Sequence, residues 1–244
     1  MNRLTAMRVI AWFLIVGGVG FSIFTVAFGF VGPNQQIHAV HNAVVASLIS
    51  VLTVPPLVAV ARRPDRAGPA LLILATLALV GLATMALSLT PDPFTLPVVV
   101  LIGALWFLAP SRDGGLPAGR PSLVMLALAL AGAVLLGLYG LDQAALQRTD
   151  QTSDHARFFH WVETSFYAAG IVALGLLGAW RPRALRLATW CAGVALAALG
   201  AASVVFAAFP SALPSPWGWA ALIGGVAFIG LGGWEVRRLT RPDD

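Results

Sequence analysis

The four histidines of the chain fall in two short segments, and imidazole is the side chain best suited to bind a metal or transfer a proton near neutral pH. His38 and His41 lie in IHAVHNAVVAS, and His155 and His160 lie in DHARFFHWVETSFYAAG. On a helix with 100° per residue, His38, His41 and Asn42 share one face. The first segment therefore predicts a histidine-bearing helix face, and the second supplies imidazoles that could meet it.

Glu163 is the most informative acidic residue. It is the only acid in the predicted apolar helices before the end of the last one, where Glu235 lies beside Arg237 and Arg238. An ionisable side chain at such a depth in a membrane is costly and by default indicates a functional site. The face of its helix is predicted to carry three further residues with polar or aromatic groups: His160, Thr164 and Tyr167.

Three kinds of chemistry fit these residues. The first hypothesis is a transition-metal site with the ligands His38, His41, His160 and Glu163, because imidazole and carboxylate together suit Zn, Cu or Fe and an i, i+3 spacing puts two ligands on one helix face. The second is a haem held between His41 and His160 as axial ligands. The third is acid–base catalysis on a lipid or quinone that is reached from the outer leaflet.

A structural role explains the same residues without chemistry. Glu163 could pair with Arg157 or with a histidine and thereby join two helices. The chain would then be a non-catalytic accessory or assembly subunit of a larger membrane complex, with the lipid bilayer and other membrane subunits as its partners. A small-solute transporter is poorly indicated, because Glu163 is the one charge predicted near the middle of the membrane.

The composition requires that lipid covers most of these elements. Hydrophobic residues make up 59% of the chain and charged residues only 10%, whereas a soluble domain carries about 25% charged residues. A membrane-spanning helix needs roughly 20 apolar residues. Eight runs approach this length: 8–31, 37–61, 70–90, 95–110, 121–141, 157–180, 184–209 and 216–235. The fourth run is short, and Pro55 and Pro56 predict a kink in the second.

Arginine gives the predicted orientation. The basic residues are all Arg, and thirteen of the fifteen lie in alternate loops or at the termini: Arg3, Arg8, Arg62, Arg63, Arg66, Arg112, Arg120, Arg181, Arg183, Arg186, Arg237, Arg238 and Arg241. The positive-inside rule then places both termini in the cytoplasm and all four histidines on the outer side. The net charge of +5 therefore reports membrane orientation and not nucleic-acid binding.

The two halves of the chain match at an offset of about 119. The matched pairs are Pro91 and Pro210, Pro97 and Pro216, Gly18 and Gly137, Gly81 and Gly200, Arg62 and Arg181, and His41 and His160. They predict tandem four-helix repeats over 1–119 and 120–244. Because four crossings are an even number, the repeats are parallel and related by an axis along the membrane normal. The predicted fold is an all-α membrane bundle of about eight helices.

The segments between the runs add few candidate residues. The longest outer segment, 142–157 (DQAALQRTDQTSDHAR), is expected to be a polar connector, in which Asp150 or Asp154 could supply a further ligand. The inner segment 110–121 is expected to be a flexible linker between the repeats. Cys191 is the single cysteine, so no disulfide or cysteine-based metal motif is formed within the chain.

The first half resembles a small four-helix membrane domain of unknown function that is common in actinobacteria. The residues that carry the resemblance are the glycine-rich end of the first run (VGGVGF…GFVG), HAVHNAVVAS at the start of the second, and ARRPDR after it. The resemblance covers roughly residues 10–66 and implies a fold and a location only. We therefore expect a multi-pass protein of the bacterial cytoplasmic (inner) membrane, without an implied activity.

Overall fold

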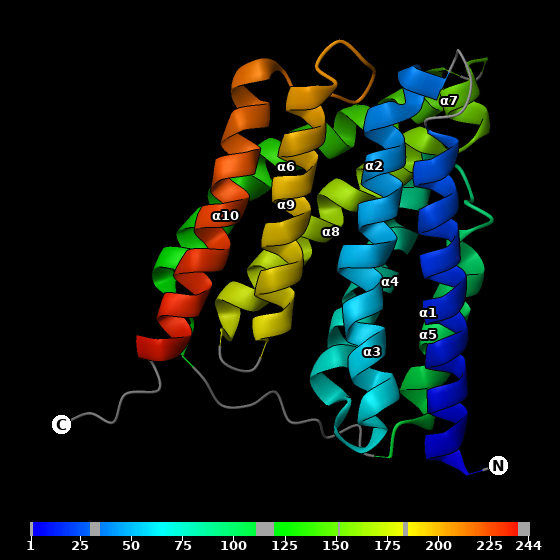
Figure 1. The fold of residues 1–244 in the computed structure, drawn as a ribbon, viewed down its shortest axis with the longest axis vertical. Helices are drawn as coiled ribbons and strands as arrows, with labels where there is room; N and C mark the ends of the chain where they lie inside the picture. The colour runs from blue at the N-terminus through cyan, green and yellow to red at the C-terminus, as the bar shows by residue number, and fades with distance from the viewer. Residues whose placement is uncertain (1, 30–34, 111–119, 151, 183–184, 239–244) are drawn as a thin grey trace.

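A computed structural model describes residues 2–29, 35–110, 120–150, 152–182 and 185–238. Every regular element in these residues is helical (Figure 1). In chain order the elements are α1 (Arg3–Phe28), η1 (Gln35–His38), α2 (Ala39–Ser47), η2 (Leu48–Thr53), α3 (Val54–Arg62), η3 (Pro64–Arg66), α4 (Gly68–Ser88), α5 (Thr95–Leu108), α6 (Leu123–Thr149), α7 (Asp154–Arg157), α8 (His160–Trp180), α9 (Arg186–Val205) and α10 (Ser215–Arg238).

Seven of the described helical segments are long and apolar enough to cross a membrane. One of them is continuous through α2, η2 and α3, from Ala39 to Arg62. The remaining predicted span, the fourth run at 95–110, corresponds to α5, which has only 14 residues. At 1.5 Å per residue it is about 21 Å long, shorter than the roughly 30 Å hydrocarbon core. The helical membrane bundle is therefore present, and a crossing by α5 stays a prediction.

The helical hydrogen bonding changes where a kink was predicted. The segment η2 is a π-helical turn, and the N–H of Val54 donates to the carbonyl of Ile49, five residues earlier. Pro55 and Pro56 follow directly and have no N–H to donate. The wider turn therefore lies immediately before the two residues that cannot continue the regular pattern.

The helix α6 extends further than predicted. Its sequence was expected to leave the membrane near residue 141, yet the helix continues to Thr149. Two buried glutamines account for the difference: Gln147 Nε2 donates to the carbonyl of Ala156 (3.0 Å), and Gln143 Oε1 accepts from Ser211 Oγ (3.0 Å). The expected connector over 142–157 is therefore wrong for its first half, because polar residues can continue a helix when the surrounding loops supply hydrogen bonds.

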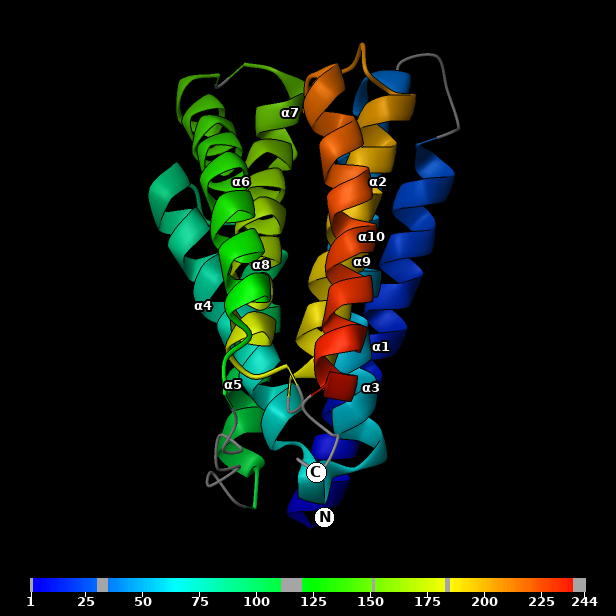
Figure 2. The same cartoon turned by 90° about the vertical axis from the view of Figure 1, so that its left-hand side faces the viewer.

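The helix α8 is central to the bundle. It packs against α4, α6 and α9, while α2 packs against α1 and α9 (Figures 1 and 2). In the predicted repeats, α2 corresponds to α8 and α4 corresponds to α9. The contact of α2 with α9 therefore corresponds to the contact of α8 with α4. Such a pair of contacts is what a twofold relation between the halves would produce, and the division into repeats at 119–120 remains a prediction.

Small residues allow two of the helices to approach closely. A Cβ atom added at Gly200 of α9 would overlap the backbone of Leu222 in α10, and one added at Gly225 of α10 would overlap the backbone of Ala197 in α9. Close approach at glycine is typical of helix contacts in membranes. The backbones of α9 and α10 therefore lie close together at these glycines.

The four histidines all lie toward one end of the bundle. The start of α1 and the end of α10 lie toward one end, which we call the terminal end (Figure 1). The elements η1 and α7 and the start of α8 lie at the opposite end, which we call the distal end (Figure 1). All four histidines lie on these distal elements or in the first turn of α2. The distal end is therefore where the predicted chemistry must be sought.

Candidate metal centre

Three short structural features position the distal histidines. His38 is the last residue of η1, His155 lies in α7, and His160 is the first residue of α8. Between α7 and α8, Phe159 adopts a left-handed conformation with φ 63° and ψ 17°, which is uncommon for a bulky residue. This residue ends one helix and allows the next to start in a new direction. His155 and His160 therefore do not lie on one continuous helix.

The short helix α7 is fixed by hydrogen bonds at its N-terminus. Ser153 Oγ accepts from the N–H of Ala156 (3.3 Å), as an N-cap does. Asp150 Oδ1 accepts in turn from the N–H of Ser153 (3.1 Å). Asp154, the other candidate ligand in this segment, is 63% exposed and lies 3.8 Å from Arg157. Asp150 and Asp154 therefore support or flank α7 and do not join the histidines.

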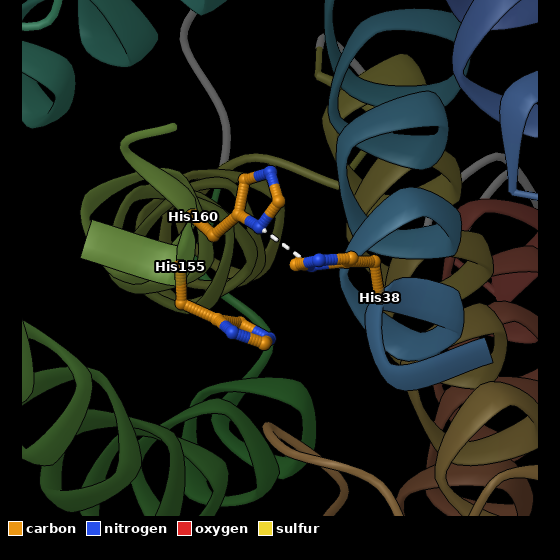
Figure 3. A group of neighbouring side chains, drawn as sticks. All are labelled: His38, His155 and His160. Carbon is orange, nitrogen blue, oxygen red and sulfur yellow. Dashed lines mark hydrogen bonds between the residues drawn. The ribbon is translucent and has the colours of Figure 1, made fainter. Parts of the chain in front are cut away.

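His38, His155 and His160 converge at the distal end, as Figure 3 shows. One ligand nitrogen from each lies within 4.8 Å of those of the other two. The Nδ1 atoms of His38 and His160 are 3.1 Å apart. In a tetrahedral site with Zn–N bonds near 2.05 Å, two ligand nitrogens are separated by about 3.3 Å. The hydrogen-bonded pair His38 and His160 has nearly this spacing, and the farthest of the three nitrogens must move closer by up to roughly 1.5 Å to complete a site.

One ring nitrogen of His155 is free to bind a metal ion, and the rest of the ring is held in place. Its Nε2 is buried and has no hydrogen-bond partner among the described residues, although buried polar atoms are normally paired. The ring also interacts with the backbone carbonyl of Ile37 and stacks on Trp161, with ring centroids 4.7 Å apart. A carbonyl that holds the second imidazole nitrogen is the usual outer-shell support of a metal-bound histidine.

The protonation state also suits metal binding. Burial lowers the pKa of His38 and of His155 below the ordinary value of 6.5. The neighbouring His38 lowers the pKa of His155 further. Both imidazoles are therefore neutral at pH 7, and neutral imidazole is the form that binds a metal.

His41 and Glu163 form a pair beside this cluster. His41 Nε2 lies 3.1 Å from Glu163 Oε2, and the side chain of His41 is only 2% exposed. His41 Nδ1 lies 3.3 Å from Thr164 Oγ1. The ring of His41 stacks on that of His160 with centroids 3.5 Å apart and an interplanar angle of 20°. Of the four predicted ligands, His38 and His160 thus meet His155, whereas His41 and Glu163 meet each other.

His155 is not among the ligands predicted from the sequence, which are His38, His41, His160 and Glu163. On a continuous helix, residues five apart point about 140° away from each other, so His155 and His160 would not have faced one site. The left-handed Phe159 removes that restriction. The one available signal was Ser153 before Asp154, because serine at this position favours the start of a separate short helix.

Among the residues that the structure describes, His38, His155 and His160 are the only group of three or more metal-ligating side chains close enough to hold one ion. Comparison with protein-family models, with curated proteins and with solved structures gives no match to this chain. Fold and site together define a class: a helical membrane bundle with a histidine cluster at one end.

Proposed function

We propose that this membrane protein binds a single transition-metal ion through His38, His155 and His160 on the extracytoplasmic side. The observation that carries the proposal is the convergence of three imidazole nitrogens from three separate elements within 4.8 Å. Because the three histidines lie in η1, α7 and α8, their proximity does not result from their spacing along one helix. The neutral state of His38 and His155 at pH 7 supports it.

The location follows from the distribution of arginine. The positive-inside rule assigns the Arg-rich terminal end to the cytoplasm, and the metal centre then faces the outside of the bacterial cytoplasmic membrane. An ion would be loaded there from the extracytoplasmic solution. Arg112, Arg183 and Arg241 also belong to this charge pattern and lie outside the described residues.

Three imidazole ligands suit Zn, Cu, Fe or Ni. With zinc, three protein ligands leave a fourth position for water or a substrate, as in catalytic zinc sites. The geometry favours such a mononuclear centre over a haem between His41 and His160. The two rings stack face to face at 3.5 Å, and no porphyrin fits between rings in contact.

The experiment is metal analysis and a UV–visible spectrum of the full chain, purified in detergent without chelators. We expect close to one transition-metal ion per chain and no Soret band. The double variant His38→Ala/His155→Ala should lose the metal. Arg157→Ala is the matched control, because Arg157 lies on α7 but is 67% exposed, and it should keep the metal.

Two results would contradict the proposal. A Soret band that is lost in His41→Ala/His160→Ala would replace the metal centre with a haem. Folded protein that contains no metal and takes up no Zn²⁺ in dialysis would leave an accessory or assembly role within a larger membrane complex.

A further inference from the structure

A cavity of about 290 Å³ lies between α1, α2, η2, α3, α4 and α5 and reaches the start of α8. Its lining is almost wholly apolar, and Glu163 is the only ionisable residue among the described residues that line it. Phe13 and Phe94 also line it and are 68% and 55% exposed. The cavity is therefore open at the surface of the bundle, and Glu163 forms part of its lining.

The hydrogen bonds around His41 and Glu163 define the protonation of this pair. Thr164 Oγ1 has one hydrogen and donates it to the carbonyl of His160 (2.8 Å). It must therefore accept from His41 Nδ1, which lies 3.3 Å away. The 3.1 Å contact between His41 Nε2 and Glu163 Oε2 requires one more proton between these atoms. The pair is then neutral overall, whichever of the two atoms holds that proton.

The carboxylate of Glu163 retains capacity to accept further hydrogen bonds. An ionised carboxylate offers about four acceptor positions, and His41 uses one of them. A buried pair of this kind stabilises a fold no better than apolar residues of similar size, and it is costly at membrane depth. A ligand that donates a hydrogen bond from within the cavity would explain why these groups are placed there.

A second cavity provides an internal contrast. It has a volume of about 530 Å³ and lies between α6, α8, α9 and α10. None of the described residues that line it is acidic or basic. The hydroxyl of Tyr139, at its edge, already donates to the carbonyl of Ser211 (2.7 Å). Hydrocarbon chains alone would satisfy this second cavity, whereas the first is lined by a carboxyl group that can accept hydrogen bonds beyond the one from His41.

The size and lining of the first cavity restrict the ligand. Its volume is at the lower limit of the roughly 300–1,000 Å³ that small-molecule sites occupy, so it suits a ring-sized head group. Phe21, Phe94 and Phe166 line it, and the rings of Phe21 and Phe94 lie 5.8 Å apart between centroids. Aromatic side chains favour a planar ring between or beside them.

We propose that this cavity binds the hydroxyl-bearing aromatic head group of a membrane-soluble amphiphile, the chemistry of a quinol, with Glu163 as the hydrogen-bond acceptor. The apolar tail extends between α1 and α5 into the lipid. The histidine ligands of the metal centre are not needed for this binding, so the proposal does not rest on the metal.

The test uses tritiated decylhydroquinone and its dimethyl ether, which keeps the shape but has no hydroxyl to donate. Binding to the detergent-solubilised full chain is measured by scintillation proximity. We expect the hydroquinone to bind at least about 10-fold more tightly than the ether, because the ether has no hydroxyl hydrogen to donate to the buried carboxyl oxygen. Glu163→Gln should weaken binding of the hydroquinone by about 10-fold, while Glu235→Gln, which changes a buried carboxyl elsewhere, should not.

A pair of glycine variants tests the cavity without removing any polar group. A Cβ at Gly17 in the first cavity, or at Gly132 in the second, would meet no atom within 4 Å, so both positions accept a larger side chain. Gly17→Leu should abolish hydroquinone binding, and Gly132→Leu should leave it unchanged.

Equal affinity for the hydroquinone and its ether would overturn the proposal in favour of simple occupation by hydrocarbon. Binding that is lost in Gly132→Leu but kept in Gly17→Leu would place the ligand in the other cavity. The metal content is measured on the same samples, so failure of this proposal and failure of the metal centre remain distinguishable.

Discussion

Two buried glutamates lie toward opposite ends of the bundle and differ in the partner with which each one pairs. Glu163, near the distal end, pairs at 3.1 Å with His41 from another helix, and that histidine is 2% exposed. Glu235, near the terminal end, lies 3.6 Å from Arg238 on its own helix, and that arginine is 59% exposed. Glu163 also lines a cavity and lies one helical turn after His160 of the histidine cluster.

The comparison shows that burial of an acid does not by itself mark a site. An i, i+3 pair at a helix end can form within a single helix and lets its basic partner remain in the interfacial water. A pair across two helices requires that the fold brings both groups to one point. The convergence of side chains from separate elements is therefore the better indicator, and it distinguishes the distal end from the terminal end.

The largest expected contrast is in stability. Glu163→Ala leaves His41 buried without its partner and should lower the free energy of unfolding by about 3 kcal/mol. Glu235→Ala removes a pair whose basic member is exposed and should cost no more than about 1 kcal/mol. Unfolding in mixed detergent micelles measures both. The double variant His41→Leu/Glu163→Leu should recover most of the loss, and if it does not, the pair itself is not the cause.

The next effect concerns the ligands of the metal centre one at a time. His38→Ala, His155→Ala and His160→Ala should each weaken Zn²⁺ binding by at least about 100-fold, more than the loss of an outer-shell partner causes. Competition with a fluorescent chelator gives the affinities. Equal binding by wild type and His155→Ala would return the site to the ligand set His38, His41, His160 and Glu163.

A smaller effect is expected from the helix caps. Ser153 caps α7 and Ser122 caps α6, each accepting from a backbone N–H at 3.3 Å. Loss of an N-cap costs about 1 kcal/mol. In Ser153→Ala this should appear as a fall of about fivefold in Zn²⁺ affinity, because α7 positions His155. Ser122→Ala should lose comparable stability with unchanged Zn²⁺ affinity, and a similar fall in both variants would show that general destabilisation is the cause.

The smallest effect is expected from mild acid. Because burial lowers the pKa of His38 and of His155, both stay neutral until the pH falls below the ordinary value of 6.5. Zn²⁺ affinity should change little between pH 7.5 and 6.5 and should fall as the pH passes below their lowered pKa values, where protons displace the metal. A steep loss of Zn²⁺ already between pH 7.5 and 6.5 would contradict the neutral state that we infer for these imidazoles.

The apolar runs predicted most of the fold because the bilayer imposes the length and composition of its helices. The extent of α6 could not be predicted in this way. Gln143 and Gln147 look like loop residues in a hydropathy pattern, and only their partners, Ser211 and Ala156, show why the helix continues. Those partners are distant in sequence or lie beyond a turn, so no local pattern identifies them.

Part of the candidate site could also be predicted from the positions of the apolar runs. His38 and His160 could be expected to meet because both lie at helix ends that are predicted to be on the same side of the membrane, where depth alone brings them near one plane. The place of His155 depends on a single left-handed residue, Phe159. Backbone conformation of this kind is set by tertiary packing and not by the identity of the residue, because phenylalanine has no preference for it.

Because the three histidines come from different elements, an ion bound to all of them would stabilise the whole bundle against unfolding. Two of them precede different membrane spans, in η1 and α7, and the third opens α8. An ion held by all three acts as a cross-link between distant parts of the chain and binds only the folded form. At a free metal concentration 100 times the dissociation constant, such linkage adds about 2.7 kcal/mol to the stability of the fold. The fraction of folded protein would then depend on the concentration of free metal at the distal end.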